Sequence, residues 1–482
     1  MKTIISMLTL AAFLAACNAA NTPTATPTAT PTILNGQPAS SGELLVKYRK
    51  GSTQNLQAGS LKISSLEDDN WGTLALVSVP EGRELEYAAK YEVQAGIEYV
   101  EPNYTIANPG RREGQLRTRA LRQSGLGTKA ITPVPETGIT DPYFVNVPAS
   151  HGFDTTGVDG TKYKNQPYLW GIKRVRAPET WAAGFKGAGV VIASIDEGVD
   201  MTHPDLAVNI WNNPKPSSRC PGAHGYDFVD EDSDPSDSGG HGTHTAGTFA
   251  AAINGIGVVG VAPEAKIMAL RALGYQGGST FMLVRAMKYA ADCGAQIASN
   301  SWGGASRTKA FSDIMEYGTA KGTTYVFSAG NSWDSGNPRN SPVGYSQFLT
   351  GVIGVAATSA DNYQTGFSSA GNFVTVAAPG QGIMSTVPVA QGNTPDDAYL
   401  MISGTSMACP HVSGVAALVV QAYRSTHNGK NPSPALVRIL IEQGANPALT
   451  AQTSAPDWTE GGQFGYGLVD AKYSTDLALV AP

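Results

Sequence analysis

The sequence predicts an α/β protein built on a doubly wound, mostly parallel sheet flanked by helices, with a small α+β domain ahead of it. Apolar strand-like and helical segments alternate from about residue 141 to the end of the 482-residue chain. The continuous apolar run at 190–196 is typical of a strand that is buried on both faces of a parallel sheet. Glycine-rich turns at 239–247 and 403–414 each lead directly into a helical pattern.

The composition is that of a globular, loop-rich protein. Charged residues make up 15% of the chain and hydrophobic residues 41%, with 55 glycines and 30 prolines. The length allows two or three domains. A net charge of −6 gives no indication of a nucleic-acid partner, and we expect a monomer.

The first seventeen residues indicate export. Lys2 precedes an apolar run that is too short to span a bilayer, and the run ends in Leu-Ala-Ala-Cys17, the pattern of a lipobox. We therefore expect lipidation at Cys17 and a membrane-anchored or extracellular protein. The alternative is an ordinary secretory signal that is cut near Ala19 or Ala20, so that Cys17 is discarded.

Residues 18–40 form a Thr/Pro tract that predicts an extended tether. Residues 41–107 predict the small α+β domain, with a helix at 85–95 and little room for another at 51–60. Its strands are expected at 43–49, 61–66, 73–79 and 97–106. Residues 108–140 are polar and basic, which predicts a linker that is open to proteolysis, although these cations could instead contact anionic lipid.

Three side chains capable of joint chemistry follow in the order Asp196, His241, Ser406. Asp196 ends the apolar strand, where open α/β sheets place their active sites. His241 and Ser406 each enter a helix from a glycine turn. A helix N-terminus favours the oxyanion that forms when a hydroxyl attacks a carbonyl. Each residue alone has a structural explanation as a turn, packing or capping residue, but the three together in this order indicate a catalytic triad.

With these motifs, the chain from about Asp141 to Asp470 resembles the subtilisin-like serine proteases, or subtilases, of the thermitase-like and fervidolysin-like kind. The resemblance implies that Ser406 is the nucleophile, His241 the general base and acid, and Asp196 the group that orients the imidazole. It also implies that Asn331, at the end of Ala-Gly-Asn, donates to the oxyanion.

Two segments resemble the walls of the family's substrate cleft. The strand at 298–304 would line the pocket with Ser301, Trp302 and Gly303, and the loop at 273–279 would face it with Gly277. An extended peptide would pair between them. The pocket floor falls near 339–341, and we expect broad specificity with an apolar bias.

The small domain resembles a subtilase propeptide, including its Glu-Pro-Asn-Tyr ending at 101–104. This implies a self-processing zymogen in which the propeptide assists folding and blocks the cleft as an intramolecular inhibitor. Protein or peptide substrates are implied once the propeptide is released.

One residue departs from the family pattern. Glu197 follows Asp196 where the family usually has Ser or Thr, whose hydroxyl supports the carboxylate. An ionised glutamate cannot donate that hydrogen bond, and two adjacent carboxylates raise one of their pKa values. We expect either a shifted pH optimum or a Glu197 side chain that turns outward.

Structural calcium is expected from the same resemblance. Asp205, Asn254 and Asp141 match the family's tight calcium site, completed by loop carbonyls. The acidic loop at 227–237 resembles a second site, with Asp227 and Asp232 as side-chain ligands; a solvated acidic loop is the alternative. His241 and His244 lack the third ligand of a zinc site.

Three cysteines follow Cys17. Cys409, three residues after Ser406, is expected to be free and buried. Cys220 and Cys293 could pair in an exported protein, but the sequence does not establish their separation and we favour no pairing.

These observations together predict a secreted or lipid-anchored serine endopeptidase that acts through an Asp-His-Ser triad and an acyl-enzyme. The alternatives are a catalytically weakened relative that binds peptides, or a lipoprotein whose protease domain serves only its own maturation.

Overall fold

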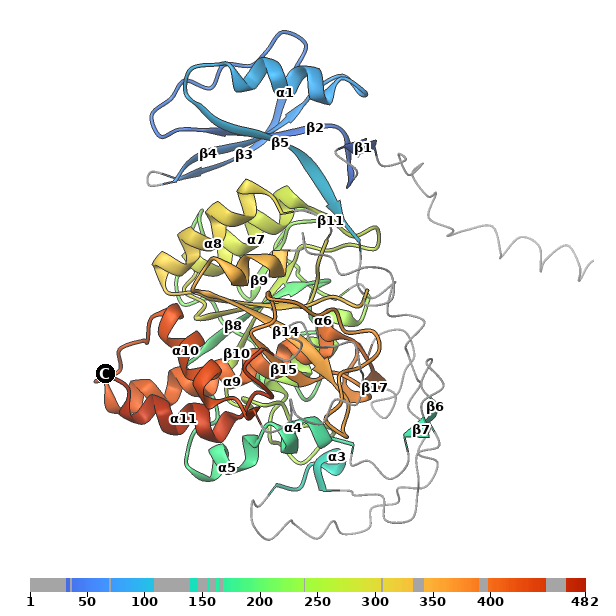
Figure 1. Cartoon of the computed structure of the whole chain (residues 1–482), viewed down its shortest axis with the longest axis vertical. Coiled ribbons are helices and arrows are strands. Elements are labelled where there is room, and N and C mark those ends of the chain that lie inside the picture. Colours follow the sequence, from blue (N-terminus) through green and yellow to red (C-terminus); the bar gives the residue numbers. More distant parts are fainter. Residues whose placement is uncertain are drawn as a thin grey trace, which may run out of the picture.

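The structure is a computed structural model. It describes residues 32–34, 37–68, 71–107, 139–145, 155–156, 162–163, 168–237, 239–304, 307–332, 342–389, 398–447 and 465–482. Cys17, most of the predicted linker and the predicted pocket floor at 339–341 lie outside these residues. Figure 1 shows a small domain with β2–β5 and α1 seated on a larger domain, above α7 and α8.

The large domain contains a seven-stranded sheet in the order β15-β14-β13-β12-β8-β10-β9, and all its pairings are parallel. Its strands are β8 (Val191–Asp196), β9 (Gly225–Asp227), β10 (Lys266–Arg271), β12 (Ile297–Asn300), β13 (Thr324–Ser328), β14 (Val352–Thr358) and β15 (Val376–Pro379). Two further pairs are antiparallel: β16 (Ile383–Thr386) with β17 (Tyr399–Ile402), and β6 (Thr155–Thr156) with β7 (Lys162–Tyr163).

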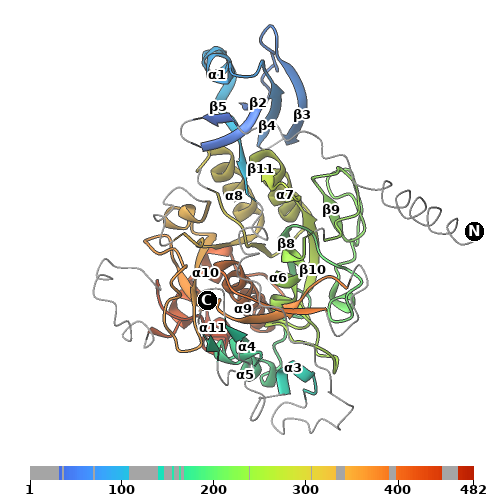
Figure 2. The same ribbon diagram turned by 90° about the vertical axis from the view of Figure 1, so that its right-hand side faces the viewer.

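Helices cover both faces of the sheet, which confirms the doubly wound fold (Figures 1 and 2). On one face α6 (His241–Ala250), α9 (Thr405–Thr426), α10 (Pro434–Gly444) and α11 (Ala471–Val480) enclose one apolar core. On the other, α7 (Thr280–Asp292) and α8 (Lys309–Lys321) enclose a second. The short helices are α3 (Pro142–Val145), α4 (Trp170–Arg174) and α5 (Ala177–Ala182). Successive β8 residues point to opposite faces, so Ile192 enters the first core and Ala193 and Ile195 enter the second, as a strand buried on both faces requires.

The small domain has the strand order β5-β2-β4-β3, with α1 (Glu84–Glu92) packed against the sheet. Its strands are β1 (Thr32–Leu34), β2 (Gln37–Tyr48), β3 (Leu61–Asp68), β4 (Gly72–Ser78) and β5 (Ile97–Ile106). The predicted strands and helix are confirmed, but β2 begins four residues before the expected domain start at 41. Residues 51–60 form turns without a helix, so the sheet carries one helix.

The sheet of the small domain continues into the large domain. Strand β5 pairs antiparallel with β11 (Gly278–Ser279), joining Ile106 to Gly278 and Thr105 to Ser279. Leu45, Leu74 and Leu76 share the apolar core that contains α7 and α8. The two domains therefore pack as one unit.

Cys220 and Cys293 form a disulfide with Cα atoms 5.7 Å apart, so the expectation that they stay unpaired is wrong. The bond links chain positions 73 residues apart, and a loop of that size is worth about 4 kcal/mol in the chain-entropy account. Cys409 is free and buried, as predicted.

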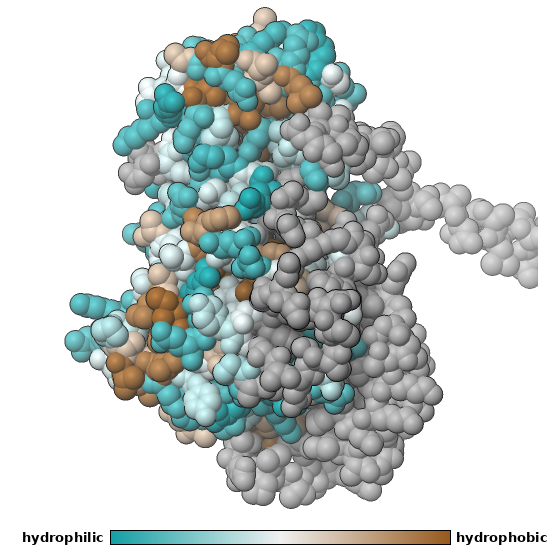
Figure 3. All heavy atoms as spheres, in the orientation of Figure 1, coloured by the Kyte–Doolittle hydropathy of each residue, from teal (hydrophilic) through white to brown (hydrophobic). Residues whose placement is uncertain are grey.

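The visible surface is mixed, with apolar patches on the small domain and over α10 and α11 (Figure 3). Exposed apolar side chains there include Ile63, Val93, Ile439 and Val480. None of the helices in the described part of the chain has the length and apolar character of a membrane span.

Candidate active site

The site begins at the carboxyl end of β8. Asp196 is the last residue of that strand and is buried. Its Oδ1 lies 2.7 Å from Nδ1 of His241, the first residue of α6, which is also buried. Gly240 before it has φ +96°, a left-handed conformation that favours glycine. The structure thus joins two of the predicted triad residues by a charge-assisted hydrogen bond.

Ser406 lies at the predicted helix start, as the second residue of α9. Its hydroxyl donates to the Ser301 carbonyl oxygen at 2.9 Å, and the Ser301 hydroxyl donates to the Ser406 carbonyl oxygen at 2.8 Å. Asn331 lies beside the same turn, because its Oδ1 accepts from the Thr405 amide at 2.9 Å. Ser406, Ser301 and Asn331 are therefore brought together around the start of α9.

Two of the predicted cleft segments border strand β5 of the small domain. Gly277, with φ +94°, precedes the residues of β11 that pair with β5. A Cβ at Gly304 would lie 3.3 Å from Ile106, which places the segment after Gly303 against the same strand. The Trp302 indole instead packs against Phe311 and Phe327 in the core, with ring centroids 5.8 and 5.3 Å away.

Glu197 is buried, so of the two expected alternatives the outward-turned side chain is wrong. Its Oε2 accepts the backbone N–H of His241 at 3.2 Å, and its own N–H donates to Asp196 Oδ1 at 2.8 Å. Burial, together with the charges of Asp196 and Asp237, raises the pKa of Glu197 to about 7, against the opposing effect of His241. The prediction that one of the two adjacent carboxylates has a raised pKa is thus confirmed, and that carboxylate is Glu197.

Asp237 is a site residue that the sequence reasoning did not single out. Its Oδ1 accepts the amides of Gly239 and Gly240 at 2.8 and 2.7 Å, and its Oδ2 accepts the amide of Thr243 at 2.8 Å. This carboxylate therefore caps α6 at the turn that carries His241. An aspartate shortly before a glycine turn and a helix was the available signal.

The predicted calcium ligands Asp141 and Asp205 lie near one loop. Asp141 Oδ1 accepts the amides of Asn254 and Gly255 at 3.1 and 3.0 Å, and Asp205 Oδ2 accepts that of Val258 at 2.9 Å. Both side chains are buried. Asp141 Oδ2 and Asp205 Oδ1 are buried without a hydrogen-bond partner among the described residues.

Burial raises the pKa of Asp205 to about 7, with a contribution from Asp141. Two buried carboxylates with unused oxygens are the environment that a hard cation would stabilise, so these residues fit calcium.

The acidic loop is arranged differently. Asp227 Oδ1 accepts the amides of Val229 and Asp230 at 2.7 and 3.0 Å, while Oδ2 pairs with Arg271. Asp232 Oδ1 accepts the amide of Asp234 at 2.8 Å. Arg271, which the pairing of β9 with β10 places beside Asp227, already supplies a positive charge to that carboxylate.

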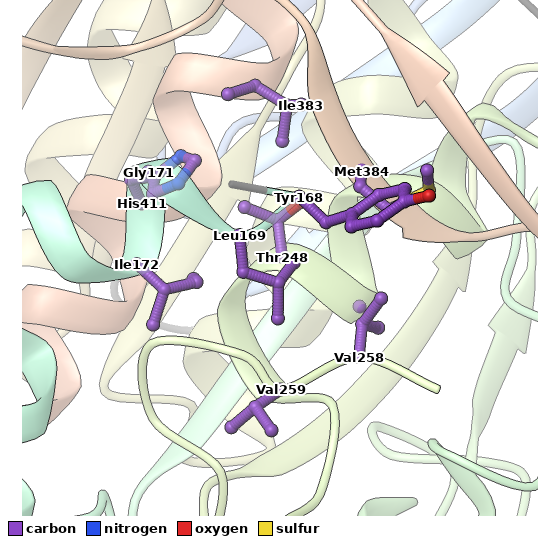
Figure 4. A pocket seen from close by; sticks show the side chains of 11 residues that line it. Tyr168, Leu169, Gly171, Ile172, Thr248, Val258, Val259, Ile383, Met384 and His411 are labelled. Atoms are coloured by element: carbon purple, nitrogen blue, oxygen red, sulfur yellow. The ribbon is translucent and has the colours of Figure 1, made fainter. Parts of the chain in front are cut away.

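A small pocket, whose lining includes neither Asp196 nor His241, is shown in Figure 4. Leu169, Ile172, Val258 and Met384 make its lining largely apolar. His411 borders it, and burial lowers the pKa of that imidazole to about 4, so it is neutral at pH 7. Its Nδ1 lies 2.8 Å from the Met407 carbonyl oxygen in the same helix, which is a structural contact.

The sequence of this chain matches two family models, the subtilase family over residues 187–467 and the fervidolysin N-terminal prodomain over 26–103. The first covers more than half of the chain. The chain therefore belongs to the subtilase family, as its motifs indicated. It is a serine endopeptidase with an N-terminal prodomain.

Individual relatives agree with this assignment. Thermitase of Thermoactinomyces vulgaris is 38% identical over 288 residues, which are 58% of this chain and 91% of thermitase. Alkaline elastase YaB of Bacillus sp. (strain YaB) is 37% identical over 311 residues, 64% of this chain and 71% of the elastase.

Among solved structures, fervidolysin from Fervidobacterium pennivorans, described as a keratinolytic enzyme related to subtilisin, superposes with a TM-score of 0.65 at 26% identity. The match covers 94% of this chain but 63% of fervidolysin, so the chain spans less than two thirds of that protein.

Proposed function

We propose that this chain is a self-processing zymogen that hydrolyses peptide bonds through Asp196, His241 and Ser406. The observation that carries the proposal is the buried 2.7 Å contact between Asp196 and His241 at the carboxyl edge of the sheet. A carboxylate on Nδ1 fixes the tautomer whose Nε2 accepts a proton. Ser406, at the start of a helix that packs against α6, is the hydroxyl that this base would serve.

Each residue has one task in the proposed reaction. Ser406 Oγ attacks the scissile carbonyl while His241 takes its proton, and the imidazolium then protonates the leaving amine. The buried Asp196 carboxylate stabilises that imidazolium. The Ser406 N–H and the Asn331 amide bind the oxyanion, a type of contact whose loss costs about 10²–10³ in turnover. Water then repeats the sequence on the acyl-enzyme.

The small domain acts as the intramolecular inhibitor in this proposal. Its last strand already pairs with β11, where an extended substrate would bind. The Glu101 carboxylate accepts the amides of Lys309 and Ala310, both at 2.9 Å, at the start of α8. Asn103 Oδ1 likewise accepts the Phe281 amide of α7 at 3.1 Å. These caps hold the domain on the two surface helices until a cut in the linker releases it.

Export with a lipid anchor at Cys17 remains part of the proposal. The Cys220–Cys293 disulfide supports an oxidising compartment, because such bonds are rare in the cytosol. The part of the Thr/Pro tract ahead of β1 would then form much of the tether to the membrane, and the mature enzyme would act as a monomer on exposed protein or peptide substrates.

The function is tested by incubating the purified full chain with a denatured protein and a serine-directed phosphonate. We expect hydrolysis, and its complete loss once the phosphonate has reacted, because the reagent mimics the tetrahedral intermediate. A thiol-directed reagent is the matched control, because Cys409 is the rival nucleophile in the same helix. Burial raises the pKa of Cys409 to about 11, so we expect no inhibition. Hydrolysis that survives the phosphonate would contradict the proposal.

Calcium at Asp141, Asp205 and Asn254 is proposed as a structural cofactor. Because it would bind the folded chain only, calcium at 1,000 times its Kd would contribute about 4 kcal/mol. Chelation is expected to lower the thermal midpoint by about 6 °C in scanning calorimetry. Asp205→Asn should remove most of this calcium dependence, whereas Asp232→Asn, the same change in the acidic loop, should leave it intact. The reverse pattern would place the ion in the acidic loop.

A further inference from the structure

The first turn of α6 is held by two carboxylates from different parts of the chain. Asp237 precedes the helix and accepts the amides of Gly239, Gly240 and Thr243. Glu197 comes from the end of β8 and accepts the amide of His241 itself. Gly240, the residue that caps the helix, provides no side-chain acceptor. The backbone of the proposed base thus depends on a residue 44 positions earlier in the chain.

Glu197 is also fixed sterically. A Cβ added to Gly239 would lie 2.1 Å from Glu197 Oε2 and 2.6 Å from its Cδ. Two atoms cannot approach so closely, so the inward position of the carboxyl group requires glycine at 239. On its other side, Glu197 follows Asp196 directly and donates its amide to the carboxylate that holds His241.

We propose that Glu197 is a positioning residue, which fixes the backbone of His241 and places a second carboxylate beside the Asp196–His241 pair. The inference rests on the proposed roles of His241 and Ser406 and adds a regulator of that site. The titratable groups around Glu197 are Asp196 on β8, His241 on α6 and Asp237 ahead of α6. The two aspartates oppose its ionisation, while a protonated His241 favours it.

The charge of Glu197 therefore changes within the working range of a histidine base. The pKa of this carboxyl group, raised to about 7, means that it is mostly neutral at pH 6 and mostly ionised at pH 8. An ionised neighbour favours the imidazolium, so it moves the acid limb of the pH–rate profile upward. The charge of Glu197 and the basicity of His241 are coupled. The apparent pKa of the acid limb therefore reflects both groups rather than either one alone.

The test compares pH profiles of kcat and kcat/KM for the wild type, Glu197→Gln and Glu197→Ala. Glutamine keeps an oxygen for the His241 amide but loses the charge. We expect its acid limb to move down by about 1 pH unit, with KM unchanged. Alanine also removes the acceptor, so kcat should fall by about 10- to 100-fold, a loss that glutamine largely restores. Glu264→Gln removes the same charge at the surface and should leave the profile in place.

Gly239→Ala adds a second line of evidence. Its methyl group should displace the Glu197 side chain and lower kcat by about 10-fold. In the Glu197→Ala background, where the space is vacant, the same substitution should lower kcat much less. Additive losses in this double-mutant cycle would contradict direct packing of the two residues.

The outcomes separate this inference from the proposed function. A wild-type chain without phosphonate-sensitive turnover would refute the protease mechanism itself. An active wild type with an unshifted Glu197→Gln profile would refute only the role of Glu197. If the glutamine variant does not fold, Glu197→Thr, with the hydroxyl usual in the family, takes its place. Failure of both to fold would also overturn the proposal, since Glu197 would then serve stability rather than positioning.

Discussion

Ser406→Ala is expected to lower the turnover of a peptide substrate by about 10⁶-fold, the size of loss known for the catalytic serine of the related subtilisin. This corresponds to about 8 kcal/mol of transition-state stabilisation. The physical reason is that the Ser406 hydroxyl is the group that forms the covalent acyl-enzyme bond in the proposed reaction. The residual rate would come from substrate binding and the oxyanion donors, Asn331 and the backbone N–H at 406.

The matched control for this variant is Ser413→Ala. Ser413 lies in the same helix, is also buried, and donates to Ser299 Oγ at 2.9 Å. The Ser413→Ala substitution removes the hydrogen bond to Ser299 and should change turnover by less than about 10-fold. Initial rates with a chromogenic peptide measure both variants. Comparable losses in the two would contradict the assignment of Ser406, because they would point to general damage of α9.

Asp196→Asn is expected to lower kcat by about 10⁴-fold, the loss that the equivalent change produces in another serine protease. A neutral amide can still accept a hydrogen bond from His241 Nδ1, but it cannot offset the positive charge that the buried imidazole acquires in the transition state. KM should change little, because Asp196 is expected to make no contact with the substrate.

Asp200→Asn is the control for this second variant. Asp200 lies four residues further along, and its carboxylate accepts from the amides of Thr202 and Val389 at 3.0 Å each. The same chemical change there should leave kcat within about 10-fold. If Asp196→Asn costs no more than Asp200→Asn in steady-state kinetics, the carboxylate does not support the base and the proposed mechanism fails.

The parts of the fold that sequence patterns predicted are those specified locally. The uninterrupted apolar run of β8 requires burial on both faces, so Asp196 had to emerge at the edge of a parallel sheet. Glycines before His241 and Ser406 marked the starts of α6 and α9, and at Gly240, with φ +96°, the turn needs the conformational freedom of glycine. The strands of the prodomain were likewise expected from short local segments of the sequence.

The parts that were missed depend on contacts between distant residues. The inward position of Glu197 requires the absence of a side chain at Gly239, which no local pattern contains. The neutralisation of Asp227 depends on Arg271, brought next to it by the pairing of β9 with β10. The distance between Cys220 and Cys293 is likewise set by packing rather than spacing.

Self-cleavage through Ser406 can be measured from the intact masses of the purified wild type and Ser406→Ala. We expect the wild type to lose the prodomain by a cut in or near 107–140, while the Ser406→Ala chain keeps it. The new N-terminus of the wild type would mark the cut. A folded wild type that stays intact, or a Ser406→Ala chain that is processed just as fast, would contradict the account.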